Sequence, residues 1–208
     1  MIILNGNGEV IFDGQTLRNV HLRDAALHGI DLAGEDLRGA ALWWSDLCGA
    51  KLQEANLAGA DFSRSGLAFT DLSHTDARGA IFQWVDLDNA RFRESTLTEA
   101  IFTGANIEYG DFQDAILRRA IFRRACLRGC SFRGAILDYA DFTGAYLRSA
   151  CFMDADLRGA NLRGCDLRLA NFIRTNLTGA DLTGANLTGA YGADLTGLDL
   201  TDVIGVAA

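Results

Sequence analysis

The chain has 208 residues, a length that suits one domain, with 49% hydrophobic residues, 23 glycines, no proline and a net charge of −8. It has no stretch of 18 consecutive apolar residues and no signal sequence at its start, so a cytoplasmic protein without a membrane span is predicted. The five cysteines form no C-x-x-C pair, which is typical of reduced thiols.

The first nine residues lie outside the repeat that fills most of the chain. They include a short apolar run, Ile2, Ile3 and Leu4. A stack of repeats buries each unit only against its neighbours, so both of its ends need a cover. We therefore predict that residues 1–9 form an N-terminal cap.

A repeat of five residues runs through residues 10–189. One apolar side chain stands at every fifth position, from Phe12 to Leu187, without a shift of register. These 36 positions, called centres below, comprise 23 Leu, 11 Phe, one Ile and one Ala. A small residue often stands two places before the centre, as at Ala55 and Ala160. Such self-similarity determines the architecture, and a period of five fits neither a helix nor an ordinary strand.

Glycine stands two residues after the centre in 16 of the 36 units, for example at Gly59 and Gly179. A type II turn needs a positive φ at its third residue, which glycine adopts without steric strain. Each unit is therefore predicted to be a short extended segment followed by a turn. Units of this kind make one side and one corner of a polygon, so the predicted fold is an all-β solenoid.

The phenylalanines indicate how many units form one coil. From Phe82 to Phe152 they recur every ten residues, with Leu or Ile at the centres between them. Four units per coil place two phenylalanine stacks on opposite sides of the core. The predicted core phenylalanines are Phe82, Phe92, Phe102, Phe112, Phe122 and Phe132. The spacing favours a four-sided coil of about 20 residues over other even arrangements. Residues 10–189 then form about nine coils, a rod roughly 43 Å long at the usual strand spacing.

The units resemble those of pentapeptide-repeat proteins. Ala55-Asn56-Leu57-Ala58-Gly59 and Ala155-Asp156-Leu157-Arg158-Gly159 are similar to the family signature A-(D/N)-L-x-x. The resemblance covers most of the chain and implies a right-handed quadrilateral β-helix; the handedness comes from the resemblance alone. It also implies a function, since several members of the family mimic DNA, bind bacterial type II topoisomerase and protect it from quinolones.

The repeat changes phase near the C-terminus. Tyr191–Gly192 interrupts it, and Leu195 and Leu200 resume it three residues late. The tail, Val203–Ala208, is apolar. We predict that residues 190–208 either cap the last coil or pair end to end with a second copy, because an uncovered strand edge invites association.

In a four-sided coil, residues at the same place in successive coils are neighbours on the surface and form columns. One column alternates in sign and predicts a ladder of ion pairs: Asp31, Lys51, Asp71, Arg91 and Asp111. A second column, at the turns, forms an acidic stripe of Glu54, Glu94, Asp114 and Asp154, with His74 among them. The acidic stripe is either an ordinary solvated edge or an anionic surface that mimics nucleic-acid phosphates. Its residues supply neither a pocket nor a second type of ligand for a metal site.

Basic charge is concentrated after residue 109. Residues 1–109 hold 16 acidic and 8 basic groups, whereas residues 110–169 hold 7 acidic and 10 basic groups. A basic column of Arg128, Arg148 and Arg168 follows Asp88 and Glu108. Stacked arginines repel one another unless they meet an acidic partner, nucleic acid or the acidic half of a second copy. Alternatively, their stems cover apolar coil edges while their charged ends stay in water.

A group of aromatic and aliphatic residues is expected to point outward. Arg64 stands between Trp44 and Trp84 in one column, a spacing that suits cation–π contacts. Trp43 and Phe69 are also predicted to be exposed. The predicted aromatic interface consists of Trp43, Trp44, Arg64, Trp84, Ile81, Ile101 and Ile121. Such a composition is typical of an interface hot spot, although local packing around bulky turns explains it equally well.

The sequence has no enzyme signature. Its three histidines lack metal-ligand or catalytic spacing, and it has no phosphate-binding loop, nucleophile elbow or zinc motif. A solenoid with a filled core also leaves no interior pocket. We therefore predict a non-enzymatic binding protein with no catalytic residues, cofactor or metal.

Two functions follow from these patterns. The first is a DNA mimic that binds DNA gyrase or topoisomerase IV. Duplex DNA carries one charge per ~1.7 Å, so five coils, roughly 24 Å, correspond to about 14 charges. Residues 1–109 have enough acidic groups, but a net charge of only −8. The second function is a scaffold or regulator that binds a protein through the aromatic interface or the basic column; direct binding of nucleic acid is disfavoured.

Overall fold

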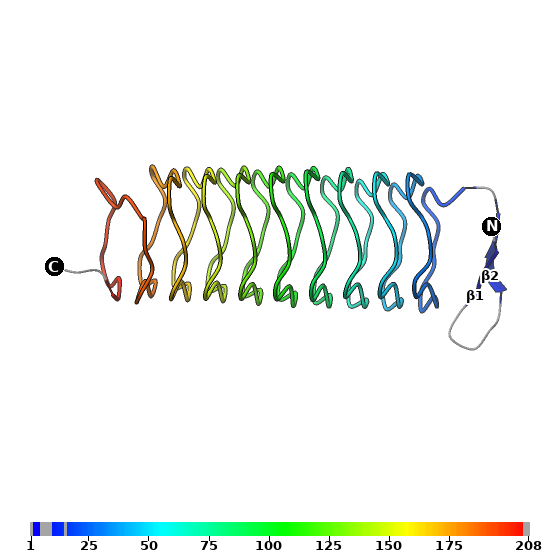
Figure 1. The fold of residues 1–208 in the computed structure, drawn as a ribbon. Coiled ribbons are helices and arrows are strands. Elements are labelled where there is room, and N and C mark those ends of the chain that lie inside the picture. Colours follow the sequence, from blue (N-terminus) through cyan, green and yellow to red (C-terminus); the bar gives the residue numbers. More distant parts are fainter. Residues whose placement is uncertain (1, 5–9, 15, 206–208) are drawn as a thin grey trace.

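The computed structural model describes residues 2–4, 10–14 and 16–205, and the side chains from residue 12 on, except that of Asp13. β1 (Ile2–Leu4) and β2 (Val10–Asp13) form an antiparallel pair at the N-terminal end of a stack of coils (Figure 1). The start of the predicted repeat thus belongs to a hairpin, although Phe12 still packs against the core. The side chains of the predicted cap, residues 1–9, lie outside the described part of the structure, so the cap stays a prediction.

Parallel bridges stack the coils on one another. Each joins a residue before a centre to the residue at the same place in the next coil, beginning with His21 and Ala41. Three further bridge positions lie between these two partners, at Ala26, Asp31 and Asp36. Each bridge is a single residue pair, so the described chain beyond Asp13 contains neither a regular strand nor a helix. Figure 1 shows the result as a rod of coils that follow one another along a single axis.

The centre residues fill the core of the rod. Every centre from Leu17 to Leu187 is buried, as is nearly every small residue two places before a centre. All six predicted core phenylalanines are fully buried. Phe112 stacks on Phe92 and Phe132, with ring centroids 4.7 and 5.0 Å apart. It meets Phe102 and Phe122 edge to face, at 6.0 and 5.8 Å. Two phenylalanine stacks therefore interlock along the rod.

The turns keep a left-handed backbone even where glycine is absent. Gly59 has a φ of 67°, and Trp44 and Glu54 have φ values of 65° and 60° in the same position of their units. A positive φ in a residue with a Cβ costs on the order of 1 kcal/mol or more. The turn is imposed by the stacked coil, and its third residue points its side chain away from the core.

The Asp or Asn before the centre caps the turn that follows. Oδ1 of Asp61 accepts a hydrogen bond from the N–H of Ser63 at 2.8 Å and another from its hydroxyl at 2.5 Å. Where an arginine stands two residues after the Asp, its guanidinium also binds the carboxylate, as Arg78 binds Asp76 at 2.7 and 2.6 Å. Short polar side chains favour such local bonds to the backbone. This bond explains the preference for Asp or Asn at this position of the repeat.

Two cysteines occupy the small core position. Cys130 and Cys165 are buried, and their thiols donate to the carbonyl oxygens of Ile107 and Phe142. Burial raises the pKa of Cys165 to about 12 and also raises that of Cys130. Both thiols therefore stay protonated and act as small core residues.

The register break changes the pairing at the C-terminal end. Asn186 pairs with Ile204, whereas in the preceding coil Asp166 pairs with Asn186. The last coil therefore contains fewer residues than the one before it. Leu195, Leu200 and Val203 are half-buried and pack against the core. They cover part of the last coil, while residues 206–208 lie outside the described part. Pairing with a second copy through this end stays a prediction.

Candidate binding surfaces

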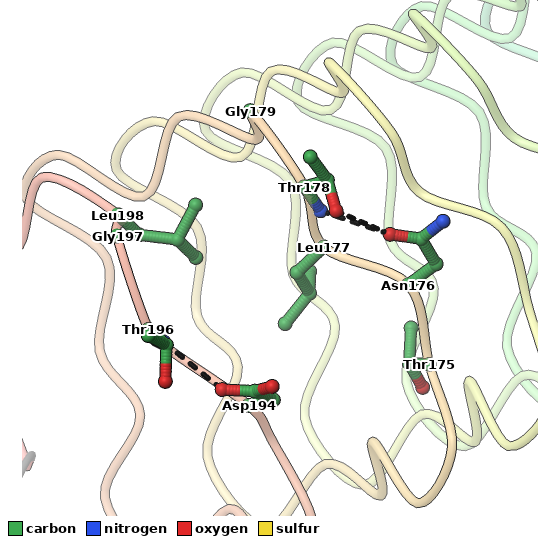
Figure 2. A pocket seen from close by; sticks show the side chains of 9 residues that line it. All are labelled: Thr175, Asn176, Leu177, Thr178, Gly179, Asp194, Thr196, Gly197 and Leu198. Atoms are coloured by element: carbon green, nitrogen blue, oxygen red, sulfur yellow. Dashed lines mark hydrogen bonds between the residues drawn. The ribbon is translucent and has the colours of Figure 1, made fainter.

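The described residues contain no group of three or more metal-ligating side chains. Nor do they contain a helix with the length and hydrophobicity of a membrane span. One hollow of about 300 Å³ lies at the register break, where Leu177 and Leu198 approach from two segments (Figure 2). Its polar groups are bound within the chain: Thr178 donates to Asn176 and the N–H of Thr196 donates to Asp194. The hydroxyl of Thr175 donates to the carbonyl oxygen of Phe152 in the preceding coil. We find no catalytic arrangement there.

The charge ladder forms in part. Lys51 lies 3.3 Å from Asp31, and Arg91 lies 3.9 Å from Asp71. Asp111, however, is bound by Arg93 at 2.7 Å rather than by its column neighbour. Ion pairs this exposed to water contribute little to the stability of the fold.

The acidic stripe lies on exposed turns of successive coils. Glu54, Glu94 and Asp114 have no lysine or arginine within 4 Å among the described residues, whereas His74 approaches Glu94 to 3.6 Å. Asp154 differs, because Arg174 binds its carboxylate at 2.5 and 2.8 Å. This hydrogen bond lowers the pKa of Asp154. Glu54, Glu94 and Asp114 are therefore the residues of the stripe without a lysine or arginine partner, and they are called the uncompensated acidic stripe below.

The basic column is largely neutralised within the chain. Arg128 binds Glu108, and Arg168 binds Asp166 at 2.6 and 2.7 Å. Of the three arginines, Arg148 alone has no carboxylate within 4 Å among the described residues. Two of the three arginines thus have an acidic partner within the chain itself. The column does not form a strongly basic surface.

The predicted aromatic interface is exposed at its turns and half-buried elsewhere. Trp44 and Trp84 are more than half exposed, whereas Trp43 is half-buried beneath Arg23. Arg64 lies over the Trp44 ring at 5.2 Å. Trp84 covers Gly104 instead, so closely that a Cβ there would overlap the indole. Figure 1 shows no loop projecting from this part of the rod.

The isoleucines of this interface form a continuous line. Bridges join Ile81 to Ile101 and Ile101 to Ile121, and all three side chains are half-buried. They replace the Asp or Asn that stands at this position in half of the units and caps the turn. The residues that follow them therefore lack the usual carboxylate or amide partner two positions earlier.

Further exposed apolar side chains were not predicted. They are Tyr109, Tyr139, Tyr146, Leu169, Tyr191 and Ile204, each about half exposed or more. Tyr109 covers Gly129, and Arg128 lies 5.5 Å from its ring. The signal in the sequence was the turn position itself, since Phe69, Tyr109, Tyr139 and Leu169 each stand two residues after a centre. Side chains at this position lean over the coil that follows.

Comparison with protein-family models matches pentapeptide repeats at residues 16–53, 49–83, 86–124 and 150–189. A second model of pentapeptide repeats matches residues 117–161. The chain therefore belongs to the pentapeptide repeat family, and its fold is a right-handed β-helix. Among curated proteins, none matches the chain.

Several solved structures are similar to this chain. A trypsin-treated variant of QnrB1, a plasmid-mediated fluoroquinolone resistance protein, is 24% identical over 90% of this chain and 91% of its own, with a TM-score of 0.48. HetL, involved in heterocyst differentiation regulation in the cyanobacterium Nostoc sp. strain PCC 7120, is 32% identical over 89% and 87%, with a TM-score of 0.32. A pentapeptide repeat protein of the Arabidopsis thaliana thylakoid lumen is 44% identical over 40% and 63%, with a TM-score of 0.34.

Proposed function

We propose that this chain is a non-enzymatic, cytoplasmic protein that binds a bacterial type II topoisomerase, DNA gyrase or topoisomerase IV, as a DNA mimic and protects it from inhibitors. The observation that carries the proposal is the uncompensated acidic stripe of Glu54, Glu94 and Asp114. QnrB1 is described as a fluoroquinolone resistance protein, a role that agrees with the proposal without supporting it independently.

The shape of the rod is part of the proposal. We infer a quadrilateral cross-section, because three further bridge positions lie between each bridge residue and its partner, as between His21 and Ala41. Residues 10–189 then correspond to about nine coils at the usual spacing of ~4.8 Å. From Glu54 to Asp114 the stripe spans four coils, or about 14 Å, and one DNA strand presents about four phosphates over that length. The three carboxylates approach this density of charge.

The test compares two sets of substitutions that change the net charge equally. One set neutralises the stripe: Glu54→Gln, Glu94→Gln and Asp114→Asn. The control set neutralises three carboxylates that already bind arginine: Asp76→Asn, Asp156→Asn and Asp166→Asn. Asn caps the same turn elsewhere in the chain, for example at Asn56, so the control keeps the backbone contact.

The assay is DNA supercoiling by gyrase, with and without a fluoroquinolone. We expect the unaltered chain and the control set to preserve supercoiling in the presence of the drug, and the stripe set to lose this effect. If the unaltered chain neither inhibits gyrase nor rescues it at micromolar concentration, the proposal fails. Equal loss in both sets would show that net charge matters and the stripe does not.

A second candidate function is a scaffold or regulator without topoisomerase activity. It is favoured by the exposure of Trp44 and Trp84 at turns where each has a positive φ. Large apolar groups at such positions serve no purpose in the core, and aromatic residues dominate binding hot spots. Trp44→Ala with Trp84→Ala should leave the fold intact and weaken capture of the partner. Unchanged capture in a pull-down would exclude this surface.

A further inference from the structure

A hollow of about 430 Å³ opens between successive coils beyond the aromatic interface. It is lined by Thr103, Arg123, Arg124 and Thr143. All four side chains carry hydrogen-bond donors, and two of them are guanidinium groups. The chain as a whole has a net charge of −8, so a hollow lined by two arginines is more positively charged than the rest of the molecule. The neighbouring column of isoleucines explains how these donors come to be available.

The isoleucines leave donors at this hollow without their usual acceptors. Where a Thr or Arg follows the centre and an Asp or Asn precedes it, their side chains usually bind each other, as Thr183 binds Asp181 at 2.6 Å. Ile101 and Ile121 occupy that place before Thr103 and Arg123. The hydroxyl of Thr103 therefore has no hydrogen-bond partner among the described residues, and Arg123 reaches to the next coil instead.

The nearby carboxylate does not neutralise the hollow. Asp141 accepts Arg123 Nε at 2.5 Å, and its other oxygen accepts the N–H and the hydroxyl of Thr143 at 3.0 and 2.5 Å. Burial alone would raise the pKa of Asp141, but the hydrogen bonds from Thr143 and Arg123 outweigh it and lower the pKa. Asp141 is thus a fully engaged anion, and it offsets one guanidinium of the two.

Arg124 is the second guanidinium. It has no carboxylate within 4 Å among the described residues, although its neighbour Arg123 has one. Its stem lies against Gly144 of the following coil, where a Cβ would still leave an ordinary contact of 3.8 Å. The positive charge of Arg124 is therefore held beside the hollow without a partner.

We propose that this hollow binds a phosphate monoester group. Two guanidiniums and a free hydroxyl present several donors to one space, and arginine is the residue that best matches the oxygens of a phosphate. A lone carboxylate ligand would use fewer of these donors. The Trp84 indole covers Gly104, which is adjacent to Thr103, so a planar aromatic group attached to the phosphate has a surface for stacking.

The test uses two probes with the same phosphate group, AMP and a short peptide that contains phosphoserine. Binding is measured by calorimetry and by the tryptophan fluorescence of a Trp43→Phe, Trp44→Phe variant, in which Trp84 is the remaining tryptophan, at low ionic strength, where screening is weak. Adenosine and acetate serve as ligands that lack the phosphate. We expect saturable binding of a phosphate probe, and Arg124→Ala and Thr103→Val each to weaken it about tenfold or more.

The matched control is Arg133→Ala, since Arg133 is exposed and also has no carboxylate within 4 Å among the described residues. It removes the same charge from a different turn and should leave binding unchanged. AMP binding tighter than the phosphopeptide identifies a nucleotide as the source of the phosphate, whereas equal or tighter binding of the peptide identifies a phosphorylated side chain. No saturable binding of either probe, or equal weakening by Arg133→Ala, would overturn the proposal. Gyrase is absent from this assay, so its outcome is independent of the topoisomerase proposal.

Discussion

The two interlocked phenylalanine stacks predict a stability difference between chemically identical substitutions. Phe112 contacts four other rings: two stacked at 4.7 and 5.0 Å, and two edge to face at 6.0 and 5.8 Å. Among the described residues Phe172 contacts a single ring, that of Phe152 at 5.2 Å. Both side chains are fully buried. Substitution of each by leucine, which occupies most other centres, therefore removes similar area but a different number of ring pairs.

The magnitude follows from the pairs lost. At about 0.5 kcal/mol per pair, the low end of measured values, Phe112→Leu loses about 2 kcal/mol of aromatic contacts and Phe172→Leu about 0.5 kcal/mol. The smaller volume of leucine adds a similar cost at both sites and cancels in the comparison. We expect Phe112→Leu to be less stable by about 1.5 kcal/mol than Phe172→Leu.

The assay is urea unfolding followed by far-UV circular dichroism, with the free energy extrapolated to water. Phe62→Leu is a second control near the other end of the rod, since Phe62 also contacts one ring in the described part of the chain, that of Phe82. Because coils near an end of a solenoid contribute less to the whole, both end variants are needed. Equal losses in all three variants would refute the role assigned to the ring pairs.

Three further predictions concern other parts of the rod. Ser45→Ala should lower the free energy of unfolding by about 1–3 kcal/mol in the same assay, because the Ser45 hydroxyl accepts the buried N–H of Ala25 and donates to Leu22. Gly104→Ala should expose Trp84 further and shift the tryptophan fluorescence of the chain to the red, since the new Cβ would overlap the indole and displace it. Acidification from about pH 4 to about pH 2 should lower the melting temperature steadily, because Asp181, whose pKa is about 2, stabilises the fold above its unfolded pKa and loses this contribution as pH falls through the folded value.

The first two of these predictions have a control within the chain. Ser95→Ala should have a smaller effect, because the Ser95 hydroxyl donates only to Phe92, a carbonyl that also accepts the Ser95 N–H. Gly59→Ala places a Cβ in open space at a positive φ, so it should destabilise the turn without moving tryptophan. A melting temperature that does not change between about pH 4 and about pH 2 would contradict the role of the aspartate caps.

The five-residue period predicted the core because burial acts on the same positions of each unit, the centre above all. Every centre from Leu17 to Leu187 is buried, including Ala77 and Ile107, which depart from the usual Leu or Phe. The recurrence of phenylalanine at every second centre also indicated the two stacks, since centres one coil apart become neighbours. Both features depend only on spacing along the chain, which a sequence displays directly.

The charged surface could not be predicted in the same way. From the coil length we predicted that Arg168 is a surface neighbour of Arg148. In the structure Arg168 binds Asp166, two residues earlier in the sequence. The cause is local: Asp166 turns its carboxylate toward the N–H of residue 168 to cap the turn, which places it beside that side chain. The length of one coil predicts which turns are adjacent, but hydrogen bonds across one turn decide which charges are neutralised.

The candidate binding surfaces lie at units that lack the glycine of the turn or the Asp or Asn that caps it. Glycine is the residue that a turn with positive φ favours, yet Glu54, Trp84 and Asp114 stand there at an energetic cost and without a contact that stabilises the core. Likewise, Ile101 and Ile121 replace the residue that caps the turn and so leave Thr103 and Arg123 without their usual partner. Departures that weaken the local structure are expected at functional sites. The acidic stripe and the aromatic interface use the first of these features and the arginine-lined hollow uses the second; Asp154 and Arg174 also have a positive φ, but they neutralise each other.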